Sequence, residues 1–316
     1  MNLLSKMQGD FMFLRQRQIL TLLLTCSIFF VAHQAGAVEI AYSYYNESSH
    51  ASNTESKRPL ILWIHGCRQS DEKFVDVTDI VEKTKHLNPL IIAPFQESKV
   101  NLLRCWNFTS SEMQKRDGEF MQVIDEVKRH IDSGEADPNR IFVGGFSSGA
   151  MFANHLALCF PDIFKGALVH SGAPFDVTGS MSSPSAAQEH AKDALACAGS
   201  ASQNGEPVVH RLKTLFYIHG KKDKVVPRFL GRHAFEQSVL YMDALDDEKF
   251  NSSYRVTPLV SRAGLSIHFG DGSSTNYIEI ENMSHRWSGS KPGSDFSSPE
   301  TLSSIDVFLK LTDQLH

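Results

Sequence analysis

One five-residue stretch has the composition of a nucleophilic catalytic corner. Gly145-Phe146-Ser147-Ser148-Gly149 fits the pattern G-x-S-x-G and directly follows the apolar segment Arg140–Gly144. In this pattern a serine occupies a sharp turn from strand to helix, and the glycines let the two elements pass closer than a Cβ permits. A serine hydroxyl becomes a good nucleophile at neutral pH when a base removes its proton. Ser147 is therefore the candidate nucleophile, and its partners must be sought elsewhere in the chain.

Two later polar residues have the types and the order that such a serine requires. A carboxylate and then a histidine are expected along the chain, the histidine as base and the carboxylate to orient it. Asp223 follows the apolar segment Thr214–Gly220, and His285 follows the last predicted strand. We predict that Ser147, Asp223 and His285 form a catalytic triad.

Nearby residues of the same types have simpler interpretations. Ser148 is adjacent to Ser147, but the two glycines centre on the latter. Three acidic residues lie in or after a predicted helix and are interpreted as a solvated face: Asp243, Asp246 and Asp247. Three histidines in or at the end of predicted strands are interpreted as structural: His170, His219 and His268.

Acyl transfer also needs hydrogen-bond donors for the oxyanion that forms, and removing one typically costs about 3–4 kcal/mol. The backbone N–H of Ser148, at the start of the helix after the turn, is one candidate. The other is the backbone N–H of Cys67, in the His65-Gly66-Cys67 loop after an early strand. Neither prediction depends on a side chain.

Short apolar runs alternate with helical patterns along the chain, as buried parallel strands and their covering helices do. This alternation predicts an α/β fold with a mostly parallel central sheet and helices on both faces. In such a sheet the functional groups gather at the carboxyl ends of the strands. Strands are expected at Pro59–Gly66, Pro89–Phe95, Ile141–Gly144 (after a turn at Asp137–Arg140), Gly166–Gly172 and Thr214–Gly220, with a hairpin at Ser266–Glu281. Helices are expected at Asp71–His86, Glu119–Ile131 and Ser148–Phe160, and a closing helix has Ser298 as its cap and Pro299 in its first turn.

The first 37 residues have the pattern of a secretory signal peptide. Basic residues precede an apolar run at Ile19–Ala32, and Ala35-Gly36-Ala37 provides the small residues of a cleavage site. The alternative, a membrane anchor, is disfavoured because the run is shorter than the ~20 residues that span a bilayer. We expect a mature single domain at 38–316 that is secreted to the periplasm or the medium, whether translation starts at Met1 or Met12.

The charge of the chain excludes some partners. The net charge is −5, and removal of the signal, with three basic residues and one acid, makes it −7. Without basic clusters, this balance argues against nucleic acid and against an anionic membrane surface as partners. The cysteine spacing includes no C-x₂-C and fits no zinc site.

Four cysteines remain in the expected mature chain: Cys67, Cys105, Cys159 and Cys197. An even number in a secreted protein favours two disulfides, for which the sequence permits three pairings. Free buried thiols are the alternative.

Five blocks together resemble a known family. They read LILWIHGCRQS, CWNF, DPNRIFVGGFSSGAMFANHLALCFPDIFKG, IHGKKDKVVP and MSHRWSG, in order from about Pro59 to Gly289. They are similar to the polyhydroxybutyrate depolymerase-like esterases, an α/β-hydrolase family that also includes feruloyl and acetylxylan esterases. The resemblance implies Ser147 as nucleophile, Asp223 as acid, His285 as base and Cys67 beside the oxyanion hole. It further implies the disulfides Cys67–Cys105 and Cys159–Cys197.

Departures from the family bear on the substrate. The sequence has no linker or polymer-binding domain, SGAPF lacks the glycine and cysteine frequent in that block, and Asp176–Gly205 is unusually polar. Attack on crystalline polymer is therefore disfavoured. Trp106 and Trp287, beside the cysteine block and His285, are candidates to line an acyl or sugar subsite, with ordinary buried aromatics as the alternative.

The sequence thus predicts a secreted serine carboxylesterase that works through an acyl-enzyme, without metal or organic cofactor. The expected substrate is a small or oligomeric ester, such as a hydroxyalkanoate oligomer or a plant-wall ester. The alternatives are a serine peptidase on the same fold and a non-catalytic secreted binding protein that retains the scaffold. Assays of p-nitrophenyl esters beside peptidyl anilides distinguish the esterase from the peptidase.

Overall fold

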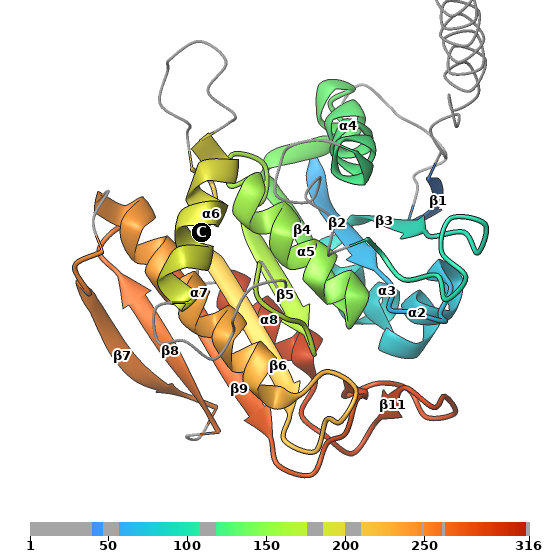
Figure 1. Cartoon of the computed structure of the whole chain (residues 1–316). Helices are drawn as coiled ribbons and strands as arrows, with labels where there is room; N and C mark the ends of the chain where they lie inside the picture. Colours follow the sequence, from blue (N-terminus) through green and yellow to red (C-terminus); the bar gives the residue numbers. More distant parts are fainter. Residues whose placement is uncertain are drawn as a thin grey trace, which may run out of the picture. The chain divides into compact units, whose positions relative to one another are not determined.

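A nine-stranded, mostly parallel sheet forms the centre of the protein in the computed structural model (Figure 1). The structure describes residues 40–46, 57–107, 118–175, 186–199, 210–247, 250–260 and 263–313. The chain divides into the units Met1–Glu39 and Ile40–His316, and all described residues belong to the second. The predicted signal peptide lies outside the described residues.

The strand order is β1-β3-β2-β4-β5-β6-β9-β8-β7. Strands β2, β3, β4, β5, β6 and β9 are parallel, and β1, β8 and β7 extend the sheet in antiparallel fashion at its edges. The strands are β1 (Ala41–Tyr45), β2 (Arg58–Ile64), β3 (Leu90–Phe95), β4 (Ala136–Phe146), β5 (Gly166–His170), β6 (Thr214–Gly220), β7 (Tyr254–Leu259), β8 (Gly264–Phe269) and β9 (Ser274–Ile280). A two-stranded parallel ribbon, β10 (Trp287–Ser288) and β11 (Ser297–Ser298), follows.

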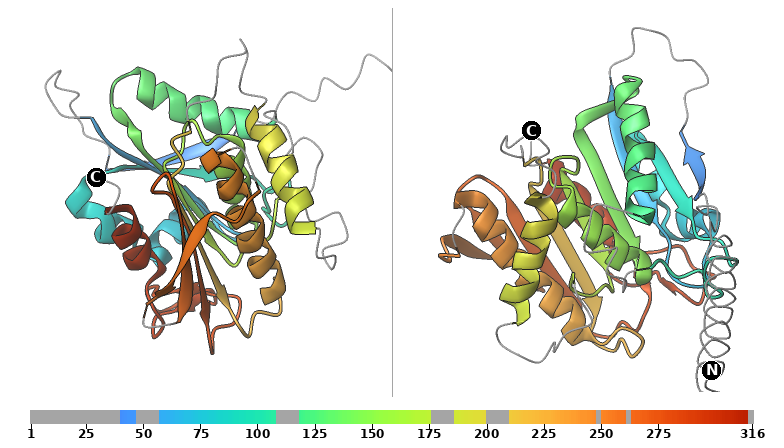
Figure 2. Two further views of the ribbon diagram at one scale, coloured as in Figure 1. Left: turned by 90° about the vertical axis from the view of Figure 1, so that its left-hand side faces the viewer. Right: turned by 45° about the horizontal axis from the view of Figure 1, so that its top comes forward.

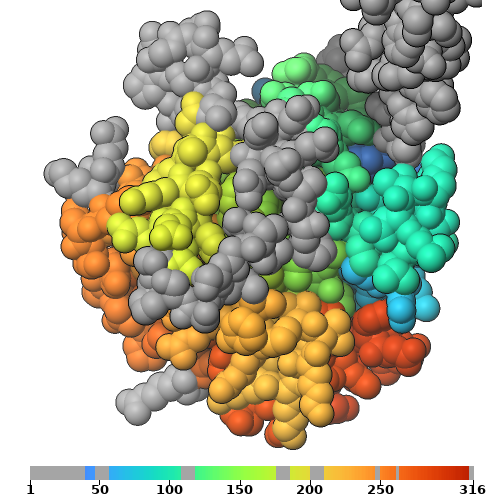
Figure 3. All heavy atoms as spheres, in the orientation of Figure 1, coloured from blue at the N-terminus to red at the C-terminus, as the bar shows by residue number. Residues whose placement is uncertain are grey.

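Helices cover both faces of the sheet (Figure 2). One face carries α4 (Glu119–Asp132), α5 (Ser148–Cys159), α6 (Ala186–Gly199) and α7 (Arg228–Asp247). The yellow atoms of α6 form part of the outer surface of this face in Figure 3. The other face carries α2 (Asp71–Thr78), α3 (Ile80–Thr84), the short 3₁₀ helix η1 (Lys85–Leu87) and α8 (Ser304–Asp313).

Strand β2 shows why two layers of helices are needed. Its side chains alternate between the two faces, and both sets are buried. Leu60, Leu62 and Ile64 join the core beneath α4 and α5, whereas Ile61 and Trp63 join the core beneath α2 and α8. A strand that is apolar at every position is typical of a parallel sheet covered on both sides, so the predicted architecture is confirmed.

Some predicted boundaries are wrong. The helix expected over 71–86 is interrupted at Asp79, whose left-handed backbone (φ 60°) ends α2. The turn expected at Asp137–Arg140 lies inside β4, as an irregularity in its pairing with β2. The closing helix begins at Ser304, because Ser298 belongs to β11 and its N–H donates to Ser290 Oγ.

The predicted disulfide between Cys159 and Cys197 is present and joins the end of α5 to α6. Its partners are separated by 38 residues, and closing a loop of that size stabilises a fold by about 2–4 kcal/mol, mainly through the unfolded chain. The double variant Cys159→Ala/Cys197→Ala should therefore unfold at lower guanidinium concentration. Its kcat on an ester should be unchanged, because Cys159 lies at the opposite end of α5 from Ser147. An unchanged unfolding midpoint would contradict this prediction.

Candidate active site

Ser147 occupies a strained turn between β4 and α5. Its backbone lies at φ 55° and ψ −121°, a conformation that costs a non-glycine residue free energy and is typically retained at functional sites. The turn is held by hydrogen bonds from Ser147 N to His170 O and from Met151 N to Ser147 O, each 3.0 Å long. A Cβ on Gly149 would collide with the carbonyl oxygens of Ile64 and His65. The glycine of the sequence motif is therefore required by the close passage of α5 over β2.

Asp223 and His285 come from two neighbouring loops at the carboxyl edge of the sheet. Asp223 follows β6 and His285 follows β9, and β6 pairs directly with β9. Nδ1 of His285 donates to Oδ2 of Asp223 over 2.7 Å. The other carboxylate oxygen, Oδ1, accepts the N–H groups of Val225 and Val226, each at 2.9 Å. Hydrogen bonds thus fix the carboxylate from two sides and leave Nε2 of His285 as the atom available to a substrate or nucleophile.

The Asp223 carboxylate is buried and charged. Burial by itself would raise the pKa of Asp223, but the contacts with His219 and His285 outweigh burial and hold the pKa well below its usual range. Because the pKa is depressed in the folded state, the carboxylate stabilises the fold above about pH 4 and its contribution is lost only in strong acid. A loss of activity between pH 7 and pH 4 must therefore come from another group.

The imidazole of His285 lies beside the turn that carries Ser147. Its ring centroid is 4.7 Å from that of Phe146, the residue before Ser147. Within the described residues no hydrogen bond joins the Ser147 hydroxyl to His285. Such bonds often tighten only once a substrate is bound. The structure thus joins Asp223 to His285 and packs His285 against Phe146, the residue that precedes the predicted nucleophile.

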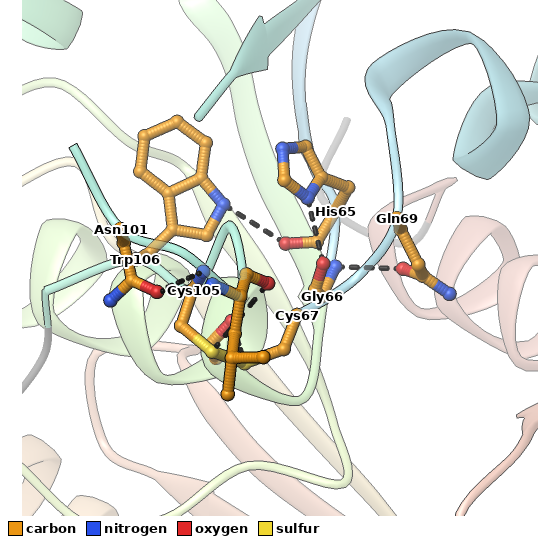
Figure 4. Close-up of a disulfide and its surroundings, with 9 residues drawn as sticks. His65, Gly66, Cys67, Gln69, Asn101, Cys105 and Trp106 are labelled. Carbon is orange, nitrogen blue, oxygen red and sulfur yellow. Dashed lines mark hydrogen bonds between the residues drawn. A yellow bond between two sulfur atoms is a disulfide. The ribbon is translucent and has the colours of Figure 1, made fainter. Parts of the chain in front are cut away.

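A disulfide closes the loop after β2 that carries the predicted oxyanion donor Cys67 (Figure 4). Cys67 is bonded to Cys105, as the resemblance implied. Two further contacts fasten the same loop: Trp106 Nε1 donates to His65 O over 2.9 Å, and Gly66 N donates to the side-chain oxygen of Gln69 over 2.7 Å. The loop is therefore held both by a covalent bond and by hydrogen bonds.

The two residues predicted to donate to an oxyanion are in direct contact. Ser148 Oγ lies 3.3 Å from Cys67 Sγ. A sulfur in a disulfide has no hydrogen, so the Ser148 hydroxyl donates. Ser148 is also the first residue of α5, where unpaired N–H groups and the helix dipole favour negative charge. The contact fixes Cys67 relative to the start of this helix.

His65, at the base of this loop, is buried with one defined tautomer. Its Nε2 accepts the N–H of Gln96 over 3.1 Å, so Nδ1 carries the hydrogen and donates to Gly66 O over 2.8 Å. Burial lowers the pKa of His65 to about 4. Protonation of Nε2 would break the bond from Gln96, which makes the loop sensitive to acid.

This depressed pKa predicts how stability depends on pH. Because the folded pKa lies below the ordinary value of 6.5, the stabilisation is complete above pH 6.5 and is lost as the pH falls toward 4. The loss should be about 2–3 kcal/mol between pH 7 and pH 4.5. Urea unfolding of His65→Asn should give lower stability at pH 7 and a smaller loss on acidification than in the wild type. Equal losses in both proteins would contradict the assignment.

Two predicted substrate contacts are wrong. The side chains of Trp106 and Trp287 are each only 1% exposed. Trp106 packs on Phe152 beneath the disulfide loop, and Trp287 packs between Trp63 and His170. Both indoles belong to the core and offer no surface to a substrate.

Asp243 is also misassigned as part of a solvated face. Its side chain is buried and accepts the N–H groups of Ser252 and Ser253, at 3.0 and 3.1 Å, which ties α7 to the chain before β7. A carboxylate in this position caps a loop and does not face water. The side chains of Asp246 and Asp247 lie outside the described residues.

The histidines interpreted as structural differ from one another. His170 accepts the N–H of Ser288 through Nε2 at 3.1 Å, and His268 contacts Thr257 Oγ1 at 2.9 Å, so both have structural roles. His219 instead lies 3.4 Å from Asp223 Oδ2. Sequence reasoning missed this neighbour of the predicted acid, although its position four residues before Asp223 at the end of a strand was a usable signal.

Three further features of the described residues concern pockets, metal-binding groups and membrane-spanning helices. A hollow of about 670 Å³ lies between α7 and the strands β8 and β9, and its lining includes none of the predicted triad. In the described part of the chain, no group of three His, Cys, Asp or Glu side chains is placed to hold a metal ion. The same residues include no helix long and apolar enough to cross a bilayer.

The sheet order, the serine turn and the acid and histidine at neighbouring strand ends define an α/β-hydrolase fold. Solved structures agree: an acetyl xylan esterase from Aspergillus awamori superposes with a TM-score of 0.63 over 87% of this chain and 94% of its own, at 17% identity. Residues 40–226 match the family described as Esterase PHB depolymerase, and the chain belongs to that family. The match includes Ser147 and Asp223 and ends before His285.

Two relatives illustrate the range of the family. Poly(3-hydroxyalkanoate) depolymerase C of Paucimonas lemoignei is 26% identical over 223 residues, covering 66% of this chain and 54% of its own length. Feruloyl esterase B of Talaromyces stipitatus is 22% identical over 244 residues, covering 74% of this chain and 66% of its own. The chain spans about half or less of the length of the first curated relatives.

Proposed function

We propose that this chain is a secreted serine carboxylesterase that hydrolyses its substrate through an acyl-enzyme. The observation that carries the proposal is the 2.7 Å hydrogen bond between His285 and Asp223 at the sheet edge where Ser147 occupies a strained turn. Membership of the Esterase PHB depolymerase family supports it. The two disulfides support secretion, because disulfides persist in oxidising compartments.

Each residue has a distinct role in the proposed reaction. Ser147 Oγ attacks the ester carbonyl carbon while His285 Nε2 takes its proton, and Asp223 stabilises the resulting imidazolium. The N–H groups of Cys67 and Ser148 donate to the oxyanion. His285 then returns the proton to the departing alcohol. A water molecule, activated by the same imidazole, releases the acid and regenerates the Ser147 hydroxyl.

The names of the relatives support a proposal for the substrate class. They are named as depolymerases of polyhydroxyalkanoates, feruloyl esterases and acetylxylan esterases. We propose that the substrate is an ester of this kind, either a soluble hydroxyalkanoate oligomer or a plant-wall ester. Soluble esters are the first substrates to test.

A panel of esters tests the proposal. Hydrolysis of p-nitrophenyl acetate and longer acyl esters, methyl ferulate, acetylated xylan oligomers and hydroxybutyrate oligomers is measured beside a peptidyl anilide. We expect turnover of at least one ester and none of the anilide. Cleavage of the anilide alone would indicate a peptidase. Cleavage of none of the substrates would favour a non-catalytic binding protein that retains the scaffold. Either result would overturn the proposed activity.

A further inference from the structure

Asp223 has a second imidazole beside it. His219, at the end of β6, has a side chain that is only 1% exposed. Its Nε2 lies 2.8 Å from Val226 O and 3.4 Å from Asp223 Oδ2. A carbonyl oxygen only accepts hydrogen bonds, so Nε2 of His219 carries the hydrogen. This N–H is directed at the loop that holds Asp223 and lies near the same carboxylate oxygen that His285 uses.

Helix α7 has a glycine where it packs against this imidazole. Gly231 lies in the first turns of α7, and a Cβ at this position would collide with His219 Nδ1. A glycine inside a helix costs about 1 kcal/mol relative to alanine. Nδ1 of His219 has no hydrogen-bond partner among the described residues. The ring is therefore placed by close packing on one side and by its Nε2 contacts on the other.

These contacts complete the surroundings of the carboxylate. Oδ1 of Asp223 accepts two backbone N–H groups, whereas Oδ2 faces His285 at 2.7 Å and His219 at 3.4 Å. His170 on β5 is a further titratable group of the described residues that interacts electrostatically with this set. His170 is buried beneath the loop of His285 and accepts the Ser288 N–H, so its own position is independent of His219.

We propose that His219 is a positioning residue for the acid and base: its Nε2–H holds the Val226 loop and shares Oδ2 of Asp223 with His285. The inference rests on the proposed function, in which His285 is the base. A carboxylate with a second donor stabilises the imidazolium of His285 less strongly than one without it. His219 therefore sets the direction in which Asp223 points and competes with His285 for the same carboxylate oxygen.

Three variants test this role through the pH profile of kcat/KM. His219→Leu should lower kcat by about tenfold with little change in KM, and should move the acid limb to higher pH by about half a unit. His219→Gln, which keeps a donor near the Nε2 position, should recover kcat to within about threefold of the wild type. Gly231→Ala displaces the unaltered imidazole and should move the limb in the same direction as His219→Leu. Melting temperatures report whether each variant folds.

The outcomes separate a positioning role from a merely structural one. A structural role lowers activity equally at every pH, or through loss of folded protein, and glutamine does not restore it. That result, or a His219→Leu enzyme with the wild-type kcat and profile, overturns the inference. If His219→Leu does not fold, the comparison of His219→Gln with Gly231→Ala decides, because the first keeps the donor and the second displaces it.

An NMR titration makes the test independent of ester turnover. The Cε1–H resonance of His285, assigned with His285→Gln, is followed against pH in the wild type and in His219→Leu or Gly231→Ala. We expect the midpoint to rise when the imidazole of His219 is removed or displaced, and an unchanged midpoint overturns the inference. A wild type that hydrolyses no ester would overturn the proposed function alone, since the titration still decides whether His219 acts on the acid and base.

Discussion

Ser147→Ala should lower kcat by about 10⁴-fold or more on whichever ester the wild type prefers. The alanine variant keeps the oxyanion donors, so the ester still binds but has no hydroxyl to attack it. KM should change little. The effect is measured by steady-state kinetics with enough enzyme to exclude traces of wild-type contamination, and by the absence of a burst of p-nitrophenol at early times.

The adjacent serine provides a matched control. Ser148→Ala keeps the backbone N–H that donates to the oxyanion and loses only the hydroxyl that contacts Cys67 Sγ. One neutral hydrogen bond contributes about 1 kcal/mol, so kcat should fall by roughly tenfold at most. The opposite result, with Ser148→Ala inactive and Ser147→Ala active, would show that Ser148 is the nucleophile and that the prediction is wrong.

The serine turn shows what a sequence can predict well. The pattern around Ser147 is local, since Gly145 and Gly149 flank the residue within one turn, and apolar runs on either side identify the strand and helix. Asp223 and His285 were predictable because the carboxyl ends of parallel strands meet at one edge. The sequence therefore predicts that three distant residues meet at this edge, and the structure joins two of them, Asp223 and His285.

Other features depend on contacts that no local pattern encodes. Asp243 has the sequence surroundings of an exposed helical residue, yet the returning chain at Ser252 and Ser253 buries it. Trp106 and Trp287 adjoin reactive residues along the chain, but their indoles turn into the core. A residue that is adjacent to a catalytic residue in sequence reaches the site only if its side chain points toward it.

The role of Gly231 also depends on a contact that no local sequence pattern encodes. In the sequence Gly231 has no evident role, and His219 is one of three histidines interpreted as structural. Only the packing of α7 against β6 shows that the glycine makes room for the imidazole. The contact between Gly231 and His219 thus explains both residues, whereas the sequence explains neither.

Asp223→Asn should lower kcat by about 10⁴-fold at neutral pH while the protein remains folded. The amide is nearly the same size as the carboxylate and can still accept the N–H groups of Val225 and Val226. It has no charge to stabilise the imidazolium of His285, and its NH₂ group favours the tautomer with the hydrogen on the wrong nitrogen. Kinetics on the preferred ester, with a melting curve for each protein, measure the effect.

Asp243→Asn separates loss of catalysis from loss of a buried carboxylate. Asp243 is also buried and also accepts two backbone N–H groups, but it lies on α7 and contacts none of the predicted triad. Its replacement should cost about 1–2 kcal/mol of unfolding free energy and leave kcat close to that of the wild type. If both variants lost the same stability and the same activity, the effect of Asp223 would be one of folding. A loss of kcat confined to Asp223→Asn would instead assign the charge of this carboxylate to the reaction.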